Sequence, residues 1–401
     1  MAAPLEGIRV VDLTSMVSGP LATMTLADQG ADVIKVEHPK TGDFARSVAG
    51  RRGGFSAAFL NNNRGKRSVA LDLKDPRGVE AVLRLAAGAD VFVQNFRPGV
   101  AERLGLGEAA VRTACGDIVY CSIAGFGFEG PYAAKPVFDP LIQALSGLAS
   151  VQAGSDDARP RLVRTILPDK LTGVQAAQAI SAALFRRERT GQGAHIRLSM
   201  LDTLMAFLWS SDMVGHTFVG DEPEEERSQS FIDLIYETAD GHISVAAMHD
   251  RNWRDLAEAL DRPDFLEDER FRTAEGREVH KDARLELTQA ALAGLTTAEA
   301  TERLEAHDVP CAPVLTRTEA RRHPQIGANA ILVEYDHPQA GRIRQARTPA
   351  RFAEGIGREP RPAPLLGADT RAVLECIGYD AGEIEALIAD GVAVDAREMA
   401  G

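Results

Sequence analysis

The chain has 401 residues, 45% hydrophobic and 26% charged, which is enough for two domains with sizeable cores and excludes a small disulfide scaffold. Its formal net charge of −13 argues against nucleic-acid binding, because a phosphate backbone would repel such a surface. No basic amino-terminal segment precedes an apolar core and no run reaches about 18 apolar residues, so we expect a cytoplasmic protein with no membrane partner.

Apolar runs of strand length alternate with helical runs in the first part of the chain. The runs at 8–13 and 32–37 are predicted strands, and the helix predicted between them at 20–29 ends at Gly30. A second unit consists of helices at 77–87 and 108–114 and strands at 90–96 and 118–123. This alternation predicts an α/β fold with a mostly parallel sheet covered by helices on both faces.

The pattern changes after about residue 200, where we expect the first large domain, 1–200, to end. A helix predicted at 172–186 is the clearest in the chain, and a further helix is expected at 202–209. The acidic run at 221–226 reads as solvated, and we assign a linker to 201–225.

A smaller α+β domain is predicted over 226–325. Asp240 and Gly241 predict a hairpin within 236–247. Helices are expected at 251–260, 280–293 and 297–306, and short strands, a proline-rich run at 358–367 and two terminal helices follow the domain.

The first strand-to-helix turn, at 13–22, has one glycine where a dinucleotide fingerprint needs three. An NAD site is therefore disfavoured, although Glu37 ends the second strand where an acidic residue can bind a ribose hydroxyl. The four cysteines form no C-x-x-C pair and the nine histidines form no H-E-x-x-H motif, so we expect no disulfide framework and no metal site. No serine lies in G-x-S-x-G, which leaves a serine hydrolase unsupported.

Residues 35–67 form a basic island, with eight basic and two acidic residues. The island is a candidate phosphate site, and the alternative is a solvated loop whose arginines pair with acids elsewhere. Lys74, Arg97 and Arg103 lie near the ends of the next predicted elements and could extend the site, with Phe96 as an apolar wall for adenosine.

Two aspartates lie close to predicted turns. The glycine-rich segment 123–132 follows a strand at the edge where α/β sheets bind ligands, or is only a tight loop, and Asp139 comes shortly after it. Asp169 follows Pro168 and precedes the long helix, which is the position of an N-cap held as a carboxylate by backbone N–H groups. On spacing alone, Asp169 is either this structural cap or a nucleophile.

A series of motifs runs through nearly the whole chain. They are PLEGIRVVDLT at 4–14, LADQGADVIKVEHP at 26–39, NRGKRSVALDLKDPRG at 63–78, ADVFVQNFRPGVAERLGLG at 89–107, IVYCSIAGFGFEGPY at 118–132, FDPLIQALSG at 138–147, the segment 168–202 that begins PDKLTG, VPCAPV at 309–314 and APLLGADT at 363–370. Together and in this order they resemble the family III CoA-transferases, the formyl-CoA transferase or CaiB/BaiF type.

The resemblance implies a Rossmann-like large domain built from both chain ends, so that 326–401 returns to complete it, and two subunits interlocked as a homodimer. It also implies that Asp169 attacks an acyl-CoA thioester, giving an aspartyl anhydride and then an aspartyl-CoA thioester as CoA passes to a free carboxylic acid. Acyl-CoA and a small carboxylic acid would then be the substrates, with no tightly bound cofactor.

The positions that match the family's CoA contacts are His38, Leu71, Lys74, Asn95, Phe96, Val100, Arg103 and Lys135. Met16, Val17 and Asp139 fall in the pocket for the acyl group and the acceptor. His38 replaces an arginine of the formyl-CoA branch, Val17 replaces a glutamine, and the glycine-rich lid of that branch is absent. Formyl-CoA and oxalate are therefore disfavoured as substrates.

Two alternatives stay open. The same superfamily contains α-methylacyl-CoA racemases, in which a G-H-D segment supplies one of two proton-transfer residues. Here Phe138 stands in place of that histidine, and phenylalanine cannot carry a proton. The second alternative is a protein that binds CoA without catalysis.

Overall fold

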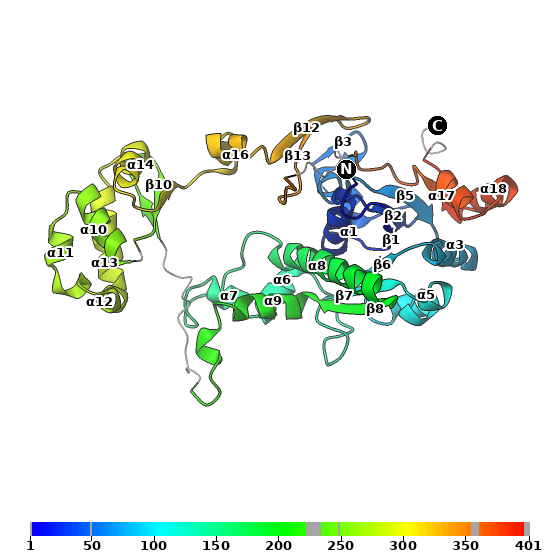
Figure 1. The fold of residues 1–401 in the computed structure, drawn as a ribbon, viewed down its shortest axis with the longest axis horizontal. Coiled ribbons are helices and arrows are strands. Elements are labelled where there is room, and N and C mark those ends of the chain that lie inside the picture. The colour runs from blue at the N-terminus through cyan, green and yellow to red at the C-terminus, as the bar shows by residue number, and fades with distance from the viewer. Residues whose placement is uncertain (1, 49, 222–233, 248, 354–360, 397–401) are drawn as a thin grey trace. The chain divides into compact units, whose positions relative to one another are not determined.

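The chain folds into two compact units. The computed structural model describes residues 2–48, 50–221, 234–247, 249–353 and 361–396 (Figure 1). The larger unit comprises Met1–Gln229 and Ile331–Gly401, so both ends of the chain belong to it, and the smaller unit comprises Ser230–Ala330. Most of the acidic run predicted as a linker, 222–226, lies outside the described residues.

A seven-stranded sheet forms the centre of the larger unit. Its order is β14-β5-β2-β1-β6-β7-β8, and all neighbours are parallel except β14, which is antiparallel to β5. The strands are β1 (Arg9–Asp12), β2 (Asp32–Glu37), β5 (Arg67–Leu71), β6 (Val91–Gln94), β7 (Val119–Ala124), β8 (Ala194–Ser199) and β14 (Ala393–Val394). The prediction of an α/β fold with a largely parallel sheet is confirmed. Because β2 and β6 flank β1 and the chain builds outward from both, the topological switch point lies between β1 and β6.

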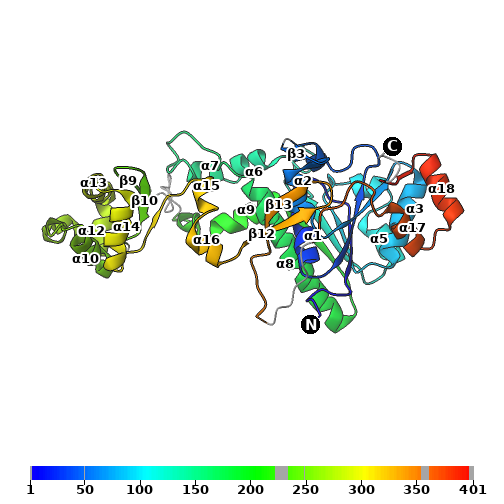
Figure 2. The same ribbon diagram turned by 90° about the horizontal axis from the view of Figure 1, so that it is seen from above.

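Helices cover both faces of the sheet, which is why its strands are continuous apolar runs rather than alternating ones. One face, which includes Val10 and Val33, packs against α1 (Ser18–Asp28) and α8 (Leu167–Thr190), which lie side by side in Figures 1 and 2. The helices on the other face are α3 (Pro76–Ala87), α5 (Glu108–Ala114), α17 (Thr370–Cys376) and α18 (Ala381–Ala389).

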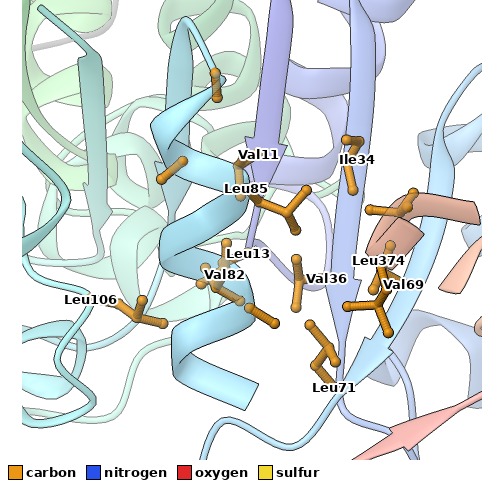
Figure 3. Packing of buried hydrophobic residues seen from close by; sticks show 14 of the residues in the cluster. Val11, Leu13, Ile34, Val36, Val69, Leu71, Val82, Leu85, Leu106 and Leu374 are labelled. Carbon is orange, nitrogen blue, oxygen red and sulfur yellow. The ribbon is translucent and has the colours of Figure 1, made fainter. Parts of the chain in front are cut away.

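The core on the second face joins the two ends of the chain. Leu85 of α3 lies over Val11 and Val82 over Leu13 at the end of β1, and Leu374 of α17 lies beside Val69 of β5 (Figure 3). The carboxyl-terminal segment also adds β14 to the sheet edge. The larger unit therefore cannot complete this core from the amino-terminal segment alone.

Further elements of the larger unit surround the sheet. They are η1 (Phe44–Ser47), β3 (Arg51–Arg52), β4 (Phe55–Ser56), α2 (Ala57–Asn63), α4 (Val100–Arg103), α6 (Asp139–Leu145), α7 (Leu148–Val151), α9 (Met200–Trp209), η2 (Val214–His216), β12 (Leu332–His337) and β13 (Gly341–Ala346). The helix predicted at 202–209 is α9, and it buries Leu204 and Leu208 in a cluster with α6. The linker assigned to 201–225 was therefore placed too early, because 201–209 is part of the larger unit's packing.

The smaller unit has its own core and an antiparallel sheet of order β11-β10-β9. Its elements are β9 (Ile235–Glu237), β10 (His242–Val245), α10 (Asp250–Ala259), α11 (Asp264–Glu267), η4 (Glu269–Phe271), α12 (Ala274–Val279), α13 (Lys281–Leu292), α14 (Thr297–Ala306), β11 (Cys311–Pro313), α15 (Arg317–Ala320) and α16 (Pro324–Ala328). The predicted hairpin is confirmed by β9 and β10, and Asp240 in its turn accepts a hydrogen bond from the N–H of Thr297 at 2.7 Å.

Two kinds of feature are missing from the described part of the chain. None of its helices combines the length and the apolar character needed to cross a membrane. Its histidine, cysteine and acidic side chains form no cluster suited to holding a metal ion.

Candidate active site

The predicted binding residues gather at the carboxyl ends of the parallel strands. Residues 13–17 follow β1, His38 follows β2, residues 72–74 follow β5 and residues 95–103 follow β6. Because these strands are parallel, the four segments leave the sheet at one edge, on both sides of the switch point. Open α/β sheets bind their ligands at this place.

Asp169 lies in the first turn of α8 and not at its N-cap. The cap is Ile166, and Pro168 is inside the first turn, where the missing N–H of a proline breaks no helical hydrogen bond. Of the two alternatives that the spacing left open for Asp169, the structural N-cap is therefore wrong. The N–H of Asp169 donates to Asp139 Oδ2 at 3.2 Å, which links the start of α8 to the start of α6.

Ser18, the first residue of α1, faces the Asp169 carboxylate. Its hydroxyl and its backbone N–H act on that carboxylate as hydrogen-bond donors that lower the pKa of Asp169. Gly173 allows α1 and α8 to come this close, because a Cβ at Gly173 would lie 2.7 Å from the carbonyl oxygen of Ser18. A larger residue at position 173 would push Ser18 away from the carboxylate.

The surroundings of Asp169 make it more basic than an exposed aspartate. Burial and the negative charge of Asp139 raise the pKa of Asp169 to about 6, against the opposing effect of the two Ser18 hydrogen bonds. Burial also raises the pKa of Asp139, while Gln143 opposes this shift. Gln143 Nε2 donates to Asp139 Oδ1 at 2.6 Å and to the carbonyl oxygen of Thr165 at 3.0 Å, so it fixes the direction of the second carboxyl.

Asn95 connects the predicted CoA segment to the loop after β1. Its Oδ1 accepts from the N–H of Ser15 at 3.0 Å, and its Nδ2 donates to the carbonyl oxygen of Ser15 at 2.8 Å. Both ends of the amide are thus engaged within the protein. In this arrangement the Asn95 side chain positions the loop. Asn95 could contact CoA only through the second N–H of its amide, the second lone pair of its Oδ1, or its backbone.

Five of the eight basic residues in the island form internal ion pairs. The pairs are Lys35–Asp43, Arg46–Glu37, Arg64–Asp28, Lys66–Asp12 and Arg67–Asp32. The interpretation of the whole island as a phosphate site is therefore wrong, and Lys40, Arg51 and Arg52 are its members at the surface. Glu37 also accepts from Ser68 Oγ at 2.7 Å, so its oxygens are engaged within the protein and the ribose-binding alternative loses its support.

The other predicted CoA residues differ in exposure. His38, Lys74, Arg103 and Lys135 are exposed, and the Lys135 ammonium lies 3.1 Å from the centroid of the Tyr132 ring. Phe96 and Val100 are half-buried, and Phe96 packs against the core cluster that includes α3. Leu71 has no exposed surface, so its side chain serves the core and only its backbone is placed to meet a ligand.

Three residues of this site were not predicted from the sequence: Ser18, Asp43 and Gln143. Ser18 precedes Gly19 and Pro20 at a helix start, and that pattern would have indicated a helix terminus at the sheet edge. Asp43 and Gln143 also have local partners, Ala45 and Asp139, but the contacts that tie them to the site, with Met16 and Thr165, lie 27 and 22 residues away in the sequence.

Replacing Asp139 by asparagine should lower the pKa of Asp169, because the change removes a neighbouring charge but keeps an oxygen to accept the Asp169 N–H. Asp169 would then lose its proton at a lower pH than the native midpoint of about 6. Infrared titration of the carboxylate bands, with Asp169→Asn as the blank, measures this midpoint. Asp157→Asn, at an exposed position, serves as the control, and an unchanged or higher midpoint in the Asp139 variant would contradict the account.

Comparison with known proteins identifies the family of this chain. A model of "CoA-transferase family III" matches residues 5–370. The mouse succinyl-CoA:glutarate CoA-transferase is 34% identical, over 97% of this chain and 90% of its own, and a probable fatty acyl-CoA transferase of Mycobacterium tuberculosis is 33% identical, over 91% and 96%. The crystal structure of a CaiB/BaiF family protein from Brucella suis matches with a TM-score of 0.81 at 30% identity, covering 94% of this chain and 100% of that one. This chain therefore belongs to CoA-transferase family III and is a CoA-transferase.

Proposed function

We propose that Asp169 carries first the acyl group and then CoA as the enzyme moves CoA from an acyl-CoA donor to a free carboxylic acid. An Asp169 oxygen attacks the thioester carbonyl, the C–S bond breaks, and CoA thiolate leaves behind an aspartyl anhydride. The thiolate then attacks the Asp169 carbonyl carbon, which releases the donor acid as a carboxylate and forms an aspartyl-CoA thioester. The acceptor carboxylate repeats the two steps in reverse, so no water or redox partner is consumed.

The main support for this proposal is the raised pKa of Asp169, which results from its burial and from the nearby charge of Asp139. With a pKa of about 6, the group is ionised in most molecules at neutral pH and is more nucleophilic than an exposed aspartate. A carboxylate is still a poor nucleophile towards a thioester in water. Binding of the CoA moiety makes the attack effectively intramolecular, and the Ser18 hydroxyl and N–H favour the ionised form of the carboxylate.

The CoA site in this proposal follows the carboxyl edge of the sheet. Lys74 after β5 and Arg103 in α4 are exposed cations there, and phosphate esters need fixed cations. Phe96 supplies an apolar surface for the adenosine, and His38 and Lys135 are further exposed donors. The five internally paired members of the basic island are left out of this site.

The acceptor is a free carboxylic acid, and its class depends on the pocket around Met16 and Val17. Relatives at similar identity are named for different acids, glutarate in one case and a fatty acyl group in another. A screen that pairs succinyl-CoA with glutarate, and a fatty acyl-CoA with short acids, separates these classes by mass spectrometry of the acyl-CoA products.

Incubation with acyl-CoA followed by hydroxylamine or borohydride should modify a peptide that contains Asp169, because both reagents trap an activated aspartyl group. Asp169→Asn should abolish the label and reduce CoA exchange by about a thousandfold or more, while CoA still binds. Asp157→Asn is the matched control and should keep both activities. Absence of the label in an exchanging enzyme would reject the covalent route, and absence of exchange with every donor and acid would favour the non-catalytic alternative.

The racemase alternative predicts a different isotope result, because a racemase exchanges the α-proton of the acyl group with solvent and leaves the thioester intact. Phe138 stands where the racemases have a histidine, and it is 66% exposed at the start of α6. Solvent deuterium should therefore not enter the α-position of a 2-methylacyl-CoA at the rate of turnover. Rapid incorporation without a label on Asp169 would establish the racemase reaction instead.

Changing Arg103 to glutamate should weaken CoA binding by about tenfold or more, because it replaces a phosphate-binding cation with an anion. The control is Arg303→Glu, the same charge change at an exposed position of α14 in the smaller unit. Calorimetric titration with CoA measures both affinities, and circular dichroism checks the fold. Equal affinities in the two variants would move the CoA site elsewhere.

An interlocked homodimer is part of the same proposal. The larger unit exposes Phe185 of α8 at 65%, Phe207 of α9 at 45% and Trp209 of α9 at 46%, and exposed aromatic groups on neighbouring helices are typical of a protein interface. Light scattering at micromolar concentration should give twice the chain mass of 43.1 kDa. A mass of one chain would reject the dimer.

A further inference from the structure

In the loop between β1 and α1, the backbones of three successive residues, Thr14, Ser15 and Met16, each form hydrogen bonds with side chains of other segments. Thr14 donates through its N–H to Asp12 Oδ1 at 2.8 Å, and its carbonyl oxygen accepts from Lys35 Nζ at 2.6 Å. Ser15 is held by both ends of the Asn95 amide. Met16 is held by Asp43, whose Oδ1 accepts from the Met16 N–H at 3.0 Å.

Asp43 is itself fixed by a buried ion pair. Its Oδ2 lies 2.9 Å from Lys35 Nζ, and the side chains of Asp43 and Lys35 are 1% and 0% exposed. The Asp43 Oδ1 that accepts from Met16 also accepts from the N–H of Ala45 at 2.9 Å, at the start of η1. A carboxylate held in this way has little freedom to move, so the Met16 N–H is directed at a fixed acceptor.

Met16 adopts a backbone conformation that needs such support. Its φ is +71°, and it is the only non-glycine residue with a positive φ in the described part of the larger unit. An L-residue in this left-handed region is strained by its Cβ, and persists where the surroundings hold it. Two residues later the chain reaches Ser18, which packs against the first turns of α8 at Gly173 and whose hydroxyl and N–H lower the pKa of Asp169.

We infer that Asp43 is a positioning residue for the transferase reaction, which acts through the left-handed conformation of Met16 to direct Ser18 at Asp169. This inference rests on the proposed role of Asp169 as nucleophile. Asp43 touches neither the substrate nor Asp169. Its effect is to keep the turn in the one conformation that presents both Ser18 donors.

The test uses variants built on Lys35→Met, because a buried ammonium without its partner would destabilise the fold by itself. Asp43→Asn in this background keeps an oxygen for the Met16 N–H, whereas Asp43→Ala removes it. We expect kcat and the rate of Asp169 labelling to be about tenfold lower in the alanine variant than in the asparagine variant. The KM for acyl-CoA should stay within about twofold, because the CoA site is untouched.

Rescue by glycine separates positioning from general damage. Adding Met16→Gly to both Asp43 variants should abolish most of the kcat difference between them, since glycine adopts a positive φ without support. The two rates are compared within one background because Met16 also lines the proposed acyl pocket. Met16→Ala removes the same side chain but keeps the Cβ, and in that background the kcat difference should persist. Equal rates in the asparagine and alanine variants, or equal effects of glycine and alanine at position 16, would overturn the inference.

The pH profile supplies an independent readout. The Ser18 hydrogen bonds lower the pKa of Asp169, so losing them should move the acid limb of kcat to higher pH in the Asp43→Ala variant, with Asp139 unchanged as the neighbouring charge. Glycine at position 16 should move the limb back. An unmoved limb together with a reduced kcat would overturn the inference.

Two outcomes need to be kept apart. If the native enzyme exchanges CoA but carries no label on Asp169, the proposed function fails before Asp43 is tested. If the native enzyme is labelled and glycine does not rescue, only the role of Asp43 fails. Should the Lys35→Met variants not fold, Asp43→Glu in the native background moves the acceptor oxygen but keeps the charge, and the same comparison of glycine and alanine at position 16 applies.

Discussion

Two ion pairs buried at the carboxyl end of β1 hold the site together. Lys66 Nζ lies 2.9 Å from Asp12 Oδ2, and Lys35 Nζ lies 2.9 Å from Asp43 Oδ2, with all four side chains at most 1% exposed. Burying charges is expensive unless each is paired and its remaining hydrogen-bonding capacity is used. Here Lys66 also donates to the carbonyl oxygen of Pro20 and to Asn63 Oδ1, both at 2.9 Å, and Asp12 accepts from Thr14 and from Thr23 at 2.7 Å. Burial lowers the pKa of Lys66 to about 8, while Lys66 and Lys35 lower the pKa of Asp12 against the effect of its burial.

These pairs give the loop after β1 a fixed shape, and the proposed nucleophile Asp169 lies against the helix that this loop begins. The network reaches Thr14 through Lys35, Met16 through Asp43 and the start of α1 through Lys66. Ser18 follows, and Gly173 lets α8 approach closely enough for Ser18 to meet Asp169. The buried charges therefore act at a distance from the reaction, since they orient the backbone and not the substrate. This arrangement makes the loop after β1 rigid at the switch point, where the segment after β6 that is proposed to bind CoA also begins.

Sequence patterns predicted the elements well because local chemistry decides them. The strand predicted at 32–37 is β2, residue for residue, and the helix at 108–114 is α5, since buried parallel strands and helices have distinct apolar runs. The sequence left two interpretations of the basic island open because a count of charges does not reveal their partners. The structure supports internal pairing for five of the eight, with Lys66 meeting Asp12, 54 residues earlier. Spacing alone could not decide between a cap and another role for Asp169, because Pro168 fits inside the first helical turn as well as before it. Its identity as the candidate nucleophile came from family resemblance, while Ser18, Asp43 and Gln143 needed three-dimensional contacts to be found.

The fate of oxygen atoms tests the covalent route most directly. In the proposed sequence the acceptor carboxylate attacks the aspartyl-CoA thioester, and CoA thiolate then cleaves the anhydride at the acyl carbon, so one acceptor oxygen remains on Asp169. The enzyme should be incubated with donor acyl-CoA and an acceptor acid labelled with oxygen-18 in its carboxylate. The mass of the peptide that contains Asp169 should then be measured by mass spectrometry. The account predicts one heavy oxygen on Asp169, and its appearance in the acid released during the next turnover. Normal turnover with no heavy oxygen in either place would contradict it.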